Sequence, residues 1–390
     1  MSIDVKGAIN PVVRDIPPSG IRKFFDIAAE MDDVISLGVG EPDFVTPWHI
    51  RDEGIYSLEK GMTYYTSNSG LKELRYEICN YLNRRFSLKY DPLSQVVVTV
   101  GGSEAIDLCV RSLIQNGDEV LIPEPSFVCY APITRLAGGV PVPIVTEAKD
   151  DFRLTPDALK AAITPKTKLL VLPFPNNPTG AIMPKSDVEK IAEVLKDTDI
   201  FVLSDEIYAE LTYGKEKHFS IAQVPEMYER TVLVSGFSKA YAMTGWRLGY
   251  ACGHPDLIKA MTKVHQFGIM SAPTTAQYAA IEAMKNGDDD IEMMKNEYNM
   301  RRKVIVKGFN DMGLDCFEPK GAFYAFPSIK STGLSSDEFC ERCLMEQKVA
   351  VIPGNAFGKS GEGFIRCSYA YSIENIKKAL SRIEAFVKSL

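Results

Sequence analysis

The sequence has no excess of basic residues and contains few histidines. Its 390 residues carry 44 lysines and arginines against 51 aspartates and glutamates, a formal net charge of −7. Proteins that bind nucleic acid broadly usually present a basic face, so the charge balance argues against that class. The 4 histidines show no His-Glu-x-x-His spacing, and we therefore expect no metal site.

Long hydrophobic runs and a cysteine framework are also missing. No run approaches the roughly 18 apolar residues of a membrane span, and the amino terminus lacks the apolar core of a signal peptide. The 8 cysteines are scattered, which suits a reducing compartment. Cys340 and Cys343 form an isolated Cys-x-x-Cys, which we place on a helix over 335–346 and not in a metal or redox site. We expect a cytoplasmic protein that binds neither membranes nor nucleic acid.

Short Val/Ile/Leu runs alternate with helical patterns between residues 95 and 255. This alternation predicts an α/β fold with βαβ units and a mainly parallel sheet. The expected strands cover 95–100, 119–122, 168–173, 200–204 and 232–235. Each is followed by a cluster of Gly, Pro, Asn or Ser, and ligands of such sheets bind at the carboxyl ends of the strands. Candidate functional residues should therefore gather along this edge.

The remaining chain predicts a second, smaller unit. The opening residues are expected to form an extended arm that leads into a helix over 21–30. A helical stretch over 274–311 leads to short strands at 322–326, 350–352 and 364–368, which predict a compact α+β unit. The predicted large domain covers 45–275, and the small domain covers 1–44 and 276–390.

The stretch 236–249, Gly-Phe-Ser-Lys-Ala-Tyr-Ala-Met-Thr-Gly-Trp-Arg-Leu-Gly, carries the strongest functional signal. It follows an expected buried strand, so Lys239 should lie at the carboxyl edge of the sheet. A lysine amine becomes a nucleophile toward carbonyl compounds when burial and nearby cations lower its pKa. Arg247 supplies such a cation, and its planar guanidinium suits phosphate oxygens. These residue types indicate a ligand with both a carbonyl and a phosphate.

This stretch resembles the cofactor-lysine signature of class I aminotransferases, which are fold type I enzymes dependent on pyridoxal phosphate. The resemblance covers about residues 16–390, with the family's motifs in order. It implies a large domain with a seven-stranded, mainly parallel sheet covered by helices. It also implies that Lys239 is the catalytic residue, covalently joined to pyridoxal 5′-phosphate, and that Ser238 and Arg247 bind this cofactor.

A glycine-rich corner follows the first expected strand. Gly101-Gly102-Ser103-Glu104 opens a helix, and the free N–H groups and positive dipole end of a helix start can hold a phosphate. Glycine pairs end strands for many other reasons, so this corner is weak evidence alone. The resemblance assigns the phosphate to Gly102, Ser103 and Glu104.

Three further segments match the family's contacts to the cofactor ring. Asp205 ends an expected strand, where a buried carboxylate needs a partner, although it could instead cap the next helix. The resemblance assigns Asp205 to the ring nitrogen, and Tyr208 and Asn177 to the phenolic oxygen. It assigns Phe127 to stacking on the ring, where core packing is the alternative.

The resemblance also implies a substrate clamp and a shared site. Arg366, in an expected half-buried strand, matches the arginine that binds the substrate carboxylate, whereas Gly40 lies in the family's amino-terminal motif near the same carboxylate. Asn177 is expected to contact the substrate as well. Tyr65, with Tyr64 as the near alternative, matches the tyrosine that reaches the phosphate of a neighbouring subunit, which implies a homodimer.

The implied activity is transfer of the amino group of an L-amino acid to a 2-oxo acid, most usually 2-oxoglutarate, by a ping-pong mechanism. Aspartate, aromatic and alanine-type donors all remain open. Some family aspartate aminotransferases carry a lysine where this chain has Ser103, so strict aspartate specificity is in doubt unless Arg22 takes that role. A β-lyase or synthase of the same fold would use the same contacts and is the main alternative. A cofactor-sensing regulator would need a DNA-binding domain and a basic patch.

Overall fold

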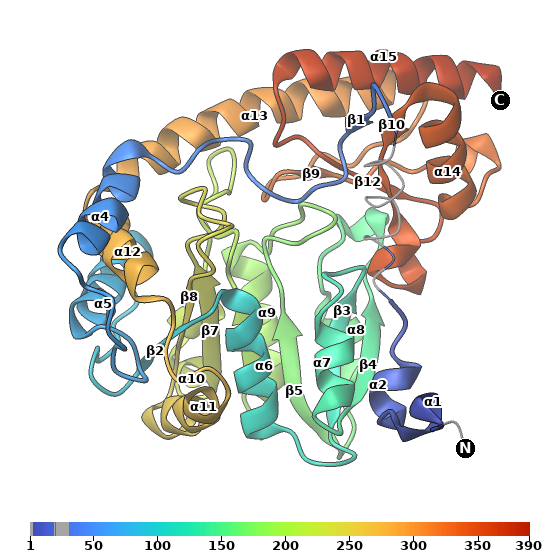
Figure 1. Ribbon diagram of the computed structural model, residues 1–390. Helices are drawn as coiled ribbons and strands as arrows, with labels where there is room; N and C mark the ends of the chain where they lie inside the picture. The colour runs from blue at the N-terminus through green and yellow to red at the C-terminus, as the bar shows by residue number, and fades with distance from the viewer. Residues whose placement is uncertain (1–2, 19, 21–30) are drawn as a thin grey trace.

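A seven-stranded sheet runs through the larger part of the molecule (Figure 1). The structure is a computed structural model that describes residues 3–18, 20 and 31–390. The strand order is β2-β8-β7-β6-β5-β3-β4, and only β8 runs antiparallel to its neighbours. The expected mainly parallel sheet is confirmed. The strands are β2 (Val96–Thr99), β3 (Glu119–Glu124), β4 (Val140–Val145), β5 (Thr167–Leu172), β6 (Phe201–Asp205), β7 (Thr231–Gly236) and β8 (Gly249–Cys252).

The central strands form where the sequence is continuously apolar. Residues of β2 and β8 are all buried, and β6 and β7 are buried along nearly their whole length, as expected for strands covered on both faces. The five expected runs correspond to β2, β3, β5, β6 and β7. Two strands were missed: β4 is an exposed edge strand with two prolines, and β8 overlaps the end of the 236–249 motif.

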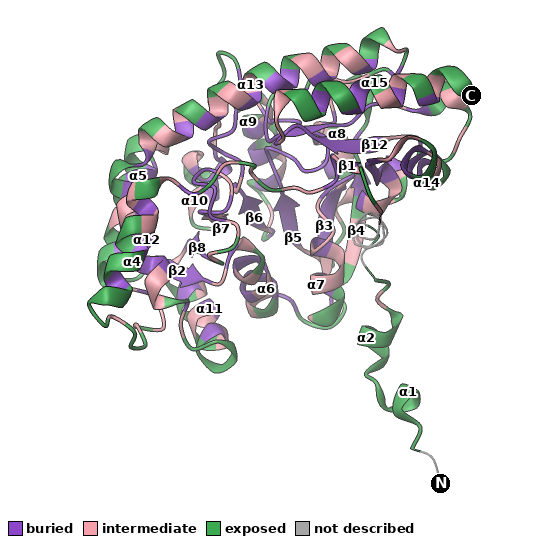
Figure 2. Ribbon diagram, turned by 45° about the horizontal axis from the view of Figure 1, so that its top comes forward, coloured by how far each residue is buried: buried purple, intermediate pink, exposed green. Residues whose placement is uncertain are grey.

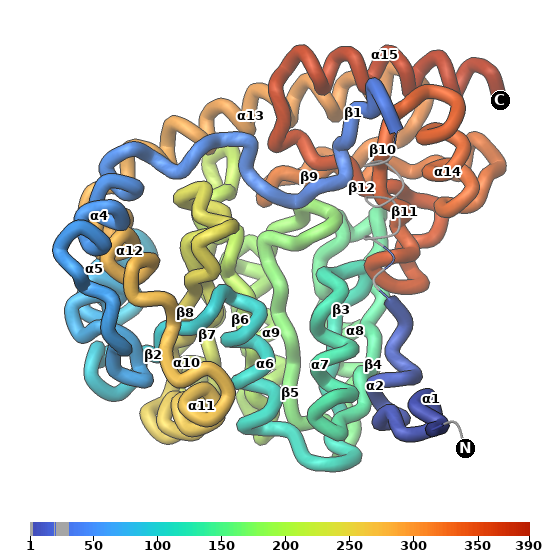
Figure 3. The backbone as a smooth tube through the Cα atoms, viewed as in Figure 1, coloured from blue at the N-terminus to red at the C-terminus, as the bar shows by residue number. Residues whose placement is uncertain are grey.

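Helices cover both faces of the sheet, as the smooth trace in Figure 3 also shows. One face is covered by α6 (Gly102–Leu113), α7 (Tyr130–Leu136) and α11 (Pro255–Gly268), which share an apolar core with it. The other face is covered by α8 (Pro156–Ala162) and α9 (Lys185–Leu195) at one end and by α5 (Lys72–Phe86) and α12 (Thr274–Asn286) at the other. Two further helices, α4 (Trp48–Glu59) and α10 (Pro225–Tyr228), belong to this part.

A smaller unit packs above the carboxyl edge of the large sheet (Figure 1). Its strands are β9 (Tyr324–Ala325), β11 (Ile352–Pro353) and β12 (Ile365–Ser368), with β1 (Ile35–Ser36) paired to β10 (Val349–Ala350). Its helices are α13 (Asp288–Asp311), α14 (Ser336–Gln347) and α15 (Ile373–Ser389). The expected short strands and the helix that carries Cys340 and Cys343 are confirmed.

The prediction of a single helical stretch over 274–311 is wrong. The chain forms α12 and α13 with Gly287 between them. A Cβ at Gly287 would lie 2.7 Å from the ring of Tyr241 and 2.6 Å from the carbonyl oxygen of Ala283, so close packing requires glycine there. Helix α12 packs on α4 and α5 of the large unit, whereas α13 continues into the small one. The domain boundary at residue 275 stays a prediction.

The amino-terminal arm also differs from the extended form that was expected. It contains two short helices, α1 (Val5–Ala8) and α2 (Pro11–Asp15), whose residues are all exposed (Figure 2). The side chains of Asp4 and Asn10 cap their first turns. The predicted helix over 21–30, and Arg22 within it, lie outside the described residues. None of the described helices has the length and apolar character that crossing a membrane requires.

Candidate active site

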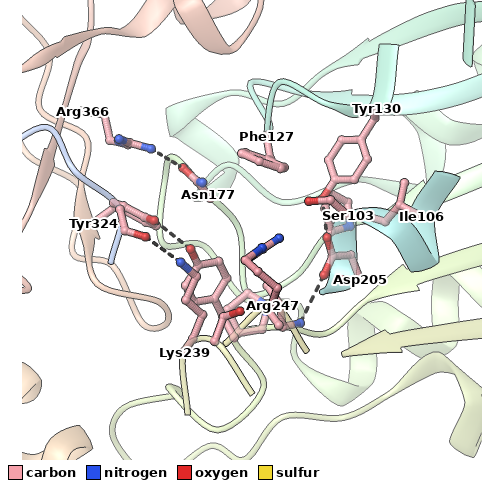
Figure 4. A pocket seen from close by; sticks show the side chains of 17 residues that line it. Ser103, Ile106, Phe127, Tyr130, Asn177, Asp205, Lys239, Arg247, Tyr324 and Arg366 are labelled. Atoms are coloured by element: carbon pink, nitrogen blue, oxygen red, sulfur yellow. Dashed lines mark hydrogen bonds between the residues drawn. The ribbon is translucent and has the colours of Figure 1, made fainter. Parts of the chain in front are cut away.

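A cavity of about 310 Å³ lies at the carboxyl edge of the large sheet, below the small unit (Figure 4). Most of the residues singled out from the sequence line it, although they come from segments far apart in the chain. These residues are Gly40, Gly102, Ser103, Phe127, Asn177, Asp205, Tyr208, Ser238, Lys239, Arg247 and Arg366. Glu104 and Tyr65 are not among the lining residues. The sheet therefore gathers the predicted side chains, as its topology requires.

Lys239 reaches this cavity from the turn after β7. Its Nζ donates to the carbonyl oxygen of Gly40 at 2.6 Å. Burial disfavours the charged ammonium and lowers the pKa of Lys239 to about 8; the positive charges of Arg366 and Arg247 act in the same direction, whereas Glu41 opposes them. About a tenth of this amine is therefore unprotonated at pH 7, and this free form is the one that acts as a nucleophile or base.

The start of α6 provides free hydrogen-bond donors beside the lysine. Gly101, with φ of +79°, precedes the helix, and no side chain caps its first turn. The first N–H groups of a helix have no partner within it, and they lie at the positive end of its dipole. Because Gly102 and Ser103 line the cavity, these donors suit an anion with several oxygens.

Arg247 lies over the same corner. A Cβ at Gly101 would lie 2.7 Å from its Nη2, so glycine lets the guanidinium approach the start of α6. Nη1 of Arg247 donates to the carbonyl oxygen of Thr244 at 3.0 Å, and the residue adopts a left-handed backbone with φ of +53°. Gly249 also packs closely against the start of α6, since a Cβ at this position would lie 2.6 Å from the backbone nitrogen of Gly102. A guanidinium and the free donors of α6 therefore point to one small volume.

Glu104 departs from its predicted place. Its side chain does not line the cavity, since its carboxylate accepts hydrogen bonds from the backbone N–H of Val100 and from the ring of His265. Only its backbone N–H, in the first turn of α6, remains suited to a phosphate.

Asp205, at the end of β6, is 7% exposed and already held from two sides. Tyr130 donates its hydroxyl proton to Oδ2 at 2.7 Å (Figure 4), and the backbone N–H of Ile207 donates to Oδ1 at 3.2 Å. Burial raises the pKa of Asp205, and these two hydrogen bonds oppose the rise. A protonated nitrogen near this carboxylate would stabilise its charged form.

Two tyrosines of this site, Tyr130 and Tyr324, were missed in the sequence, as were the apolar lining residues Ile106, Pro173, Pro175 and Ile207. Tyr324, on β9, is 1% exposed, and its hydroxyl lies 2.7 Å from that of Tyr208. The Tyr324 hydroxyl also fills the space where a Cβ of Gly40 would be, at 2.3 Å. Burial raises the pKa of both phenols, so they remain protonated near neutral pH and form a paired donor and acceptor.

Arg366, on β12, is 2% exposed and is fixed between two aromatic rings. Its guanidinium carbon lies 4.6 Å from the ring centre of Tyr324 and 4.7 Å from that of Phe357. Nη1 donates to Oδ1 of Asn177 at 3.0 Å (Figure 4), and Nη2 donates to the carbonyl oxygen of Gly38. Nε has no partner within the described part of the chain. This oriented, incompletely satisfied guanidinium suits a carboxylate.

Tyr65 lies outside the cavity and is 82% exposed, as is Tyr64. Phe127 lines the cavity, and its ring meets that of Tyr130 edge to face at a centroid distance of 6.1 Å.

The described residues contain no group of three or more His, Cys, Asp or Glu side chains placed to hold a metal ion.

Several known proteins are similar to this chain over nearly its whole length. The family model described as "Aminotransferase class I and II" matches residues 32–383. A Bacillus subtilis protein, YugH, whose name gives aminotransferase and no substrate, is 54% identical over 97% of this chain and 98% of its own. An aspartate aminotransferase of Pyrococcus abyssi is 47% identical over 96% of each chain. The crystal structure of an aromatic aminotransferase from Pyrococcus horikoshii superposes with a TM-score of 0.90, at 44% identity, over 95% of this chain and 99% of that one.

Proposed function

The chain belongs to the class I and II aminotransferase family, and we propose that it moves the amino group of an aspartate-like or aromatic L-amino acid to a 2-oxo acid, most usually 2-oxoglutarate. The family depends on pyridoxal phosphate, and the reaction class is amino transfer. The observation that carries the proposal is the convergence in one cavity of a lysine of lowered pKa, a buried carboxylate and two guanidinium groups.

These groups fit pyridoxal phosphate. The free donors of α6 and the guanidinium of Arg247 match a phosphate, the buried carboxylate of Asp205 matches a protonated ring nitrogen, and Lys239 matches the carbonyl. We assign to cofactor binding Gly102, Ser103, Glu104 through its backbone, Phe127, Asn177, Asp205, Tyr208, Ser238, Lys239 and Arg247.

The bound cofactor supplies a carbonyl carbon that takes up the amino group and an electron-poor ring that accepts electrons from the substrate's α-carbon. The protein supplies the charges around this chemistry. Asp205 would hold the proton of the ring nitrogen: at about 4 Å and an effective dielectric of about 20, the attraction is about 4 kcal/mol. The hydroxyl of Tyr130 keeps this carboxylate oriented.

Arg366 would bind the substrate carboxylate and so orient the α-carbon. Its contacts to Asn177 and Gly38 and the two flanking rings restrict its rotation before the substrate arrives, which lowers the entropy cost of binding. Asn177 contacts Arg366 directly, and Gly40 is two positions from Gly38, which also accepts from Arg366. We therefore assign Gly40 and Asn177 to the substrate site as well.

Lys239 would then act at the α-carbon as a base. A free amine takes the α-proton onto Nζ, and the lowered pKa keeps part of this amine unprotonated near pH 7. Nζ would then give up this proton again, and water would release the first product as a 2-oxo acid, with the amino group left on the bound cofactor. A second 2-oxo acid would take up this amino group by the reverse sequence. Because the first product leaves before the second substrate binds, ping-pong kinetics follow.

The cations of the cavity favour amino donors beyond aspartate. The described cations are Lys239, Arg247 and Arg366, and all three have roles other than binding a distal carboxylate. Ser103 stands where some aspartate aminotransferases carry a lysine. An aromatic side chain needs no further cation, whereas an acidic one needs a group such as Arg22.

We also propose a homodimer, located in the cytoplasm, in which Tyr65 contacts the phosphate of the neighbouring subunit. Exposed apolar side chains support an interface at this edge: Tyr64 and Tyr65 are each 82% exposed and Phe267 is 83% exposed. A hydrogen bond joins the 64–70 loop to the turn that follows α11, since Nδ2 of Asn68 donates to the carbonyl oxygen of Met270 at 2.8 Å. The 8 unpaired thiols suit a reducing compartment.

A half-reaction assay tests the proposed activity. The purified, cofactor-loaded protein is mixed with single L-amino acids while the absorbance of its yellow colour is followed, and then a 2-oxo acid is added. We expect the yellow colour to fade with aromatic and acidic donors and to return with 2-oxoglutarate. Release of ammonia and pyruvate without an oxo acid would instead identify a β-lyase, and Lys239→Ala, the control, should show no change with any donor.

A further inference from the structure

A buried hydrogen bond joins α6 to α11 behind the cavity. Nδ1 of His265 lies 2.7 Å from Oε1 of Glu104, and their side chains are 0% and 13% exposed. A carboxylate can only accept hydrogen bonds, so Nδ1 carries the proton and donates it. The mechanism above uses neither side chain.

Both residues lie at the ends of their helices. Glu104 is in the first turn of α6, where a carboxylate interacts favourably with the helix dipole, and His265 is in the last turn of α11. The second carboxylate oxygen of Glu104 accepts the backbone N–H of Val100. The carboxylate therefore fixes the turn between β2 and α6, which is the turn that carries Gly102 and Ser103.

The carboxylate of Glu104 and an anion in the cavity would compete for the same helix end. The positive end of α6 can stabilise either the carboxylate of Glu104 or an anion in the cavity, and two negative charges close together repel each other. The contact with His265 holds the carboxylate away from the cavity, and the side chain of Glu104 does not line it. The free donors at the start of α6 remain available for a ligand.

His265 also connects to the loop that carries Tyr65. Its carbonyl oxygen accepts the backbone N–H groups of Ile269 at 2.8 Å and Met270 at 3.0 Å. The carbonyl oxygen of Met270 in turn accepts from Asn68. His265 thus fixes both the corner of α6 and the turn on which the 64–70 loop rests.

The ring makes one hydrogen bond within the described residues, the one to Glu104, since Nε2 is buried without a partner there. A buried polar atom without a partner is costly, and an apolar side chain would avoid this cost. The contact of Nδ1 with Glu104 is therefore the interaction that distinguishes histidine from an apolar residue at this position.

We propose that His265 is a positioning residue for phosphate recognition, which holds the carboxylate of Glu104 on Val100 and out of the phosphate site. The inference rests on the proposed function, because it takes the start of α6 as the phosphate site. Its consequence is specific: loss of the Nδ1 donor weakens binding of the phosphate and leaves recognition of the ring unchanged.

The test compares two ligands that differ only in the phosphate. Dissociation constants of pyridoxal 5′-phosphate and pyridoxal are measured on the ligand-free protein and on His265→Phe, which keeps a ring without nitrogen. The ratio of the two constants cancels effects on Lys239 and on the ring. We expect His265→Phe to reduce the preference for the phosphorylated ligand about tenfold, the effect of one hydrogen bond to a charged group.

His218 provides a matched control. Its Nε2 lies 2.8 Å from Oε2 of Glu206, and both side chains are as buried as those of the first pair, at 8% and 3% exposed. His218→Phe should lower the melting temperature without changing the ratio. His265→Asn, whose amide nitrogen can replace Nδ1 as donor, should retain most of the preference.

A double variant, His265→Phe with Glu104→Gln, tests the charge directly, because it removes the carboxylate that the single variant leaves unpaired. It should recover most of the preference for the phosphorylated ligand. If His265→Phe does not fold, His265→Leu, which also lacks a donor, takes its place and must also lower the ratio. An unchanged ratio in these variants would overturn the inference, whereas a wild-type protein that binds both ligands equally would overturn the phosphate site itself.

Discussion

The amine of Lys239 should titrate near pH 8 in the ligand-free protein, far below an exposed lysine. Burial removes the water that stabilises the ammonium, and the nearby guanidinium groups of Arg366 and Arg247 disfavour a third positive charge. At pH 8 about half of Lys239 is then free amine, whereas an ordinary lysine with a pKa of about 10.4 is free to only about 0.4%.

Competitive labelling measures this difference. Ligand-free protein is pulsed with acetic anhydride between pH 6 and pH 11, and acetylation of the Lys239 peptide is quantified by mass spectrometry. The exposed Lys307, whose side chain is 74% exposed, serves as the internal reference. The midpoint of the rate against pH is used and not the absolute rate, because the cavity restricts access of the reagent.

Charge variants give the expected signs. Glu41 raises the pKa of Lys239, so Glu41→Gln should move the midpoint lower; Arg247→Gln removes a cation and should move it higher. Effective charges of this kind shift a pKa by a few tenths to about one unit. A midpoint near 10, or one that neither variant moves, would refute the reasoning.

Two further predictions concern the substrate and cofactor ends of the cavity. Arg366→Lys keeps the charge but loses the planar guanidinium and its two ring contacts. KM for every amino donor should therefore rise at least tenfold in steady-state assays. A tenfold fall in kcat with an unchanged KM would contradict a binding role. Tyr324→Phe removes the hydroxyl paired with Tyr208, so the pH midpoint of the colour of the cofactor-loaded protein should shift by about 0.5 unit; an identical titration would exclude this coupling.

Motifs in the sequence predicted most of the lining of the cavity because the chemistry there depends on residue types at the ends of strands. Lys239 and Asp205 follow apolar strands whose carboxyl ends meet at one edge in any parallel sheet. The sheet itself followed from the same runs. The sheet and the places of Lys239 and Asp205 needed only the periodicity of the chain and the direction of its strands, whereas the other lining residues were predicted from the resemblance to class I aminotransferases.

Contacts between segments far apart in the chain could not be predicted in this way. Tyr324 lies on a strand of only two residues, and its hydroxyl meets Tyr208 across 116 positions. Tyr130 opens a short helix, where an aromatic residue more often packs in a core, yet its hydroxyl reaches Asp205. The place of Glu104 also depends on a distant residue. Its position in a helix start predicts a ligand contact, whereas its side chain contacts His265, 161 positions away. Each outcome depends on tertiary packing that local patterns do not contain.

Burial moves the charged groups of the ligand-free cavity toward their neutral forms. It lowers the pKa of Lys239 and of Arg366 and raises that of Asp205. Each shift means that the folded protein stabilises the charged form less than water does. The ring nitrogen and the carboxylate of the bound molecules carry charges opposite to those of Asp205 and Arg366, so binding favours the charged forms of these two residues that burial disfavours. Because the ligand then stabilises the folded state by an amount that grows with its affinity, the same buried charges that make this cavity reactive also make its stability depend on the cofactor.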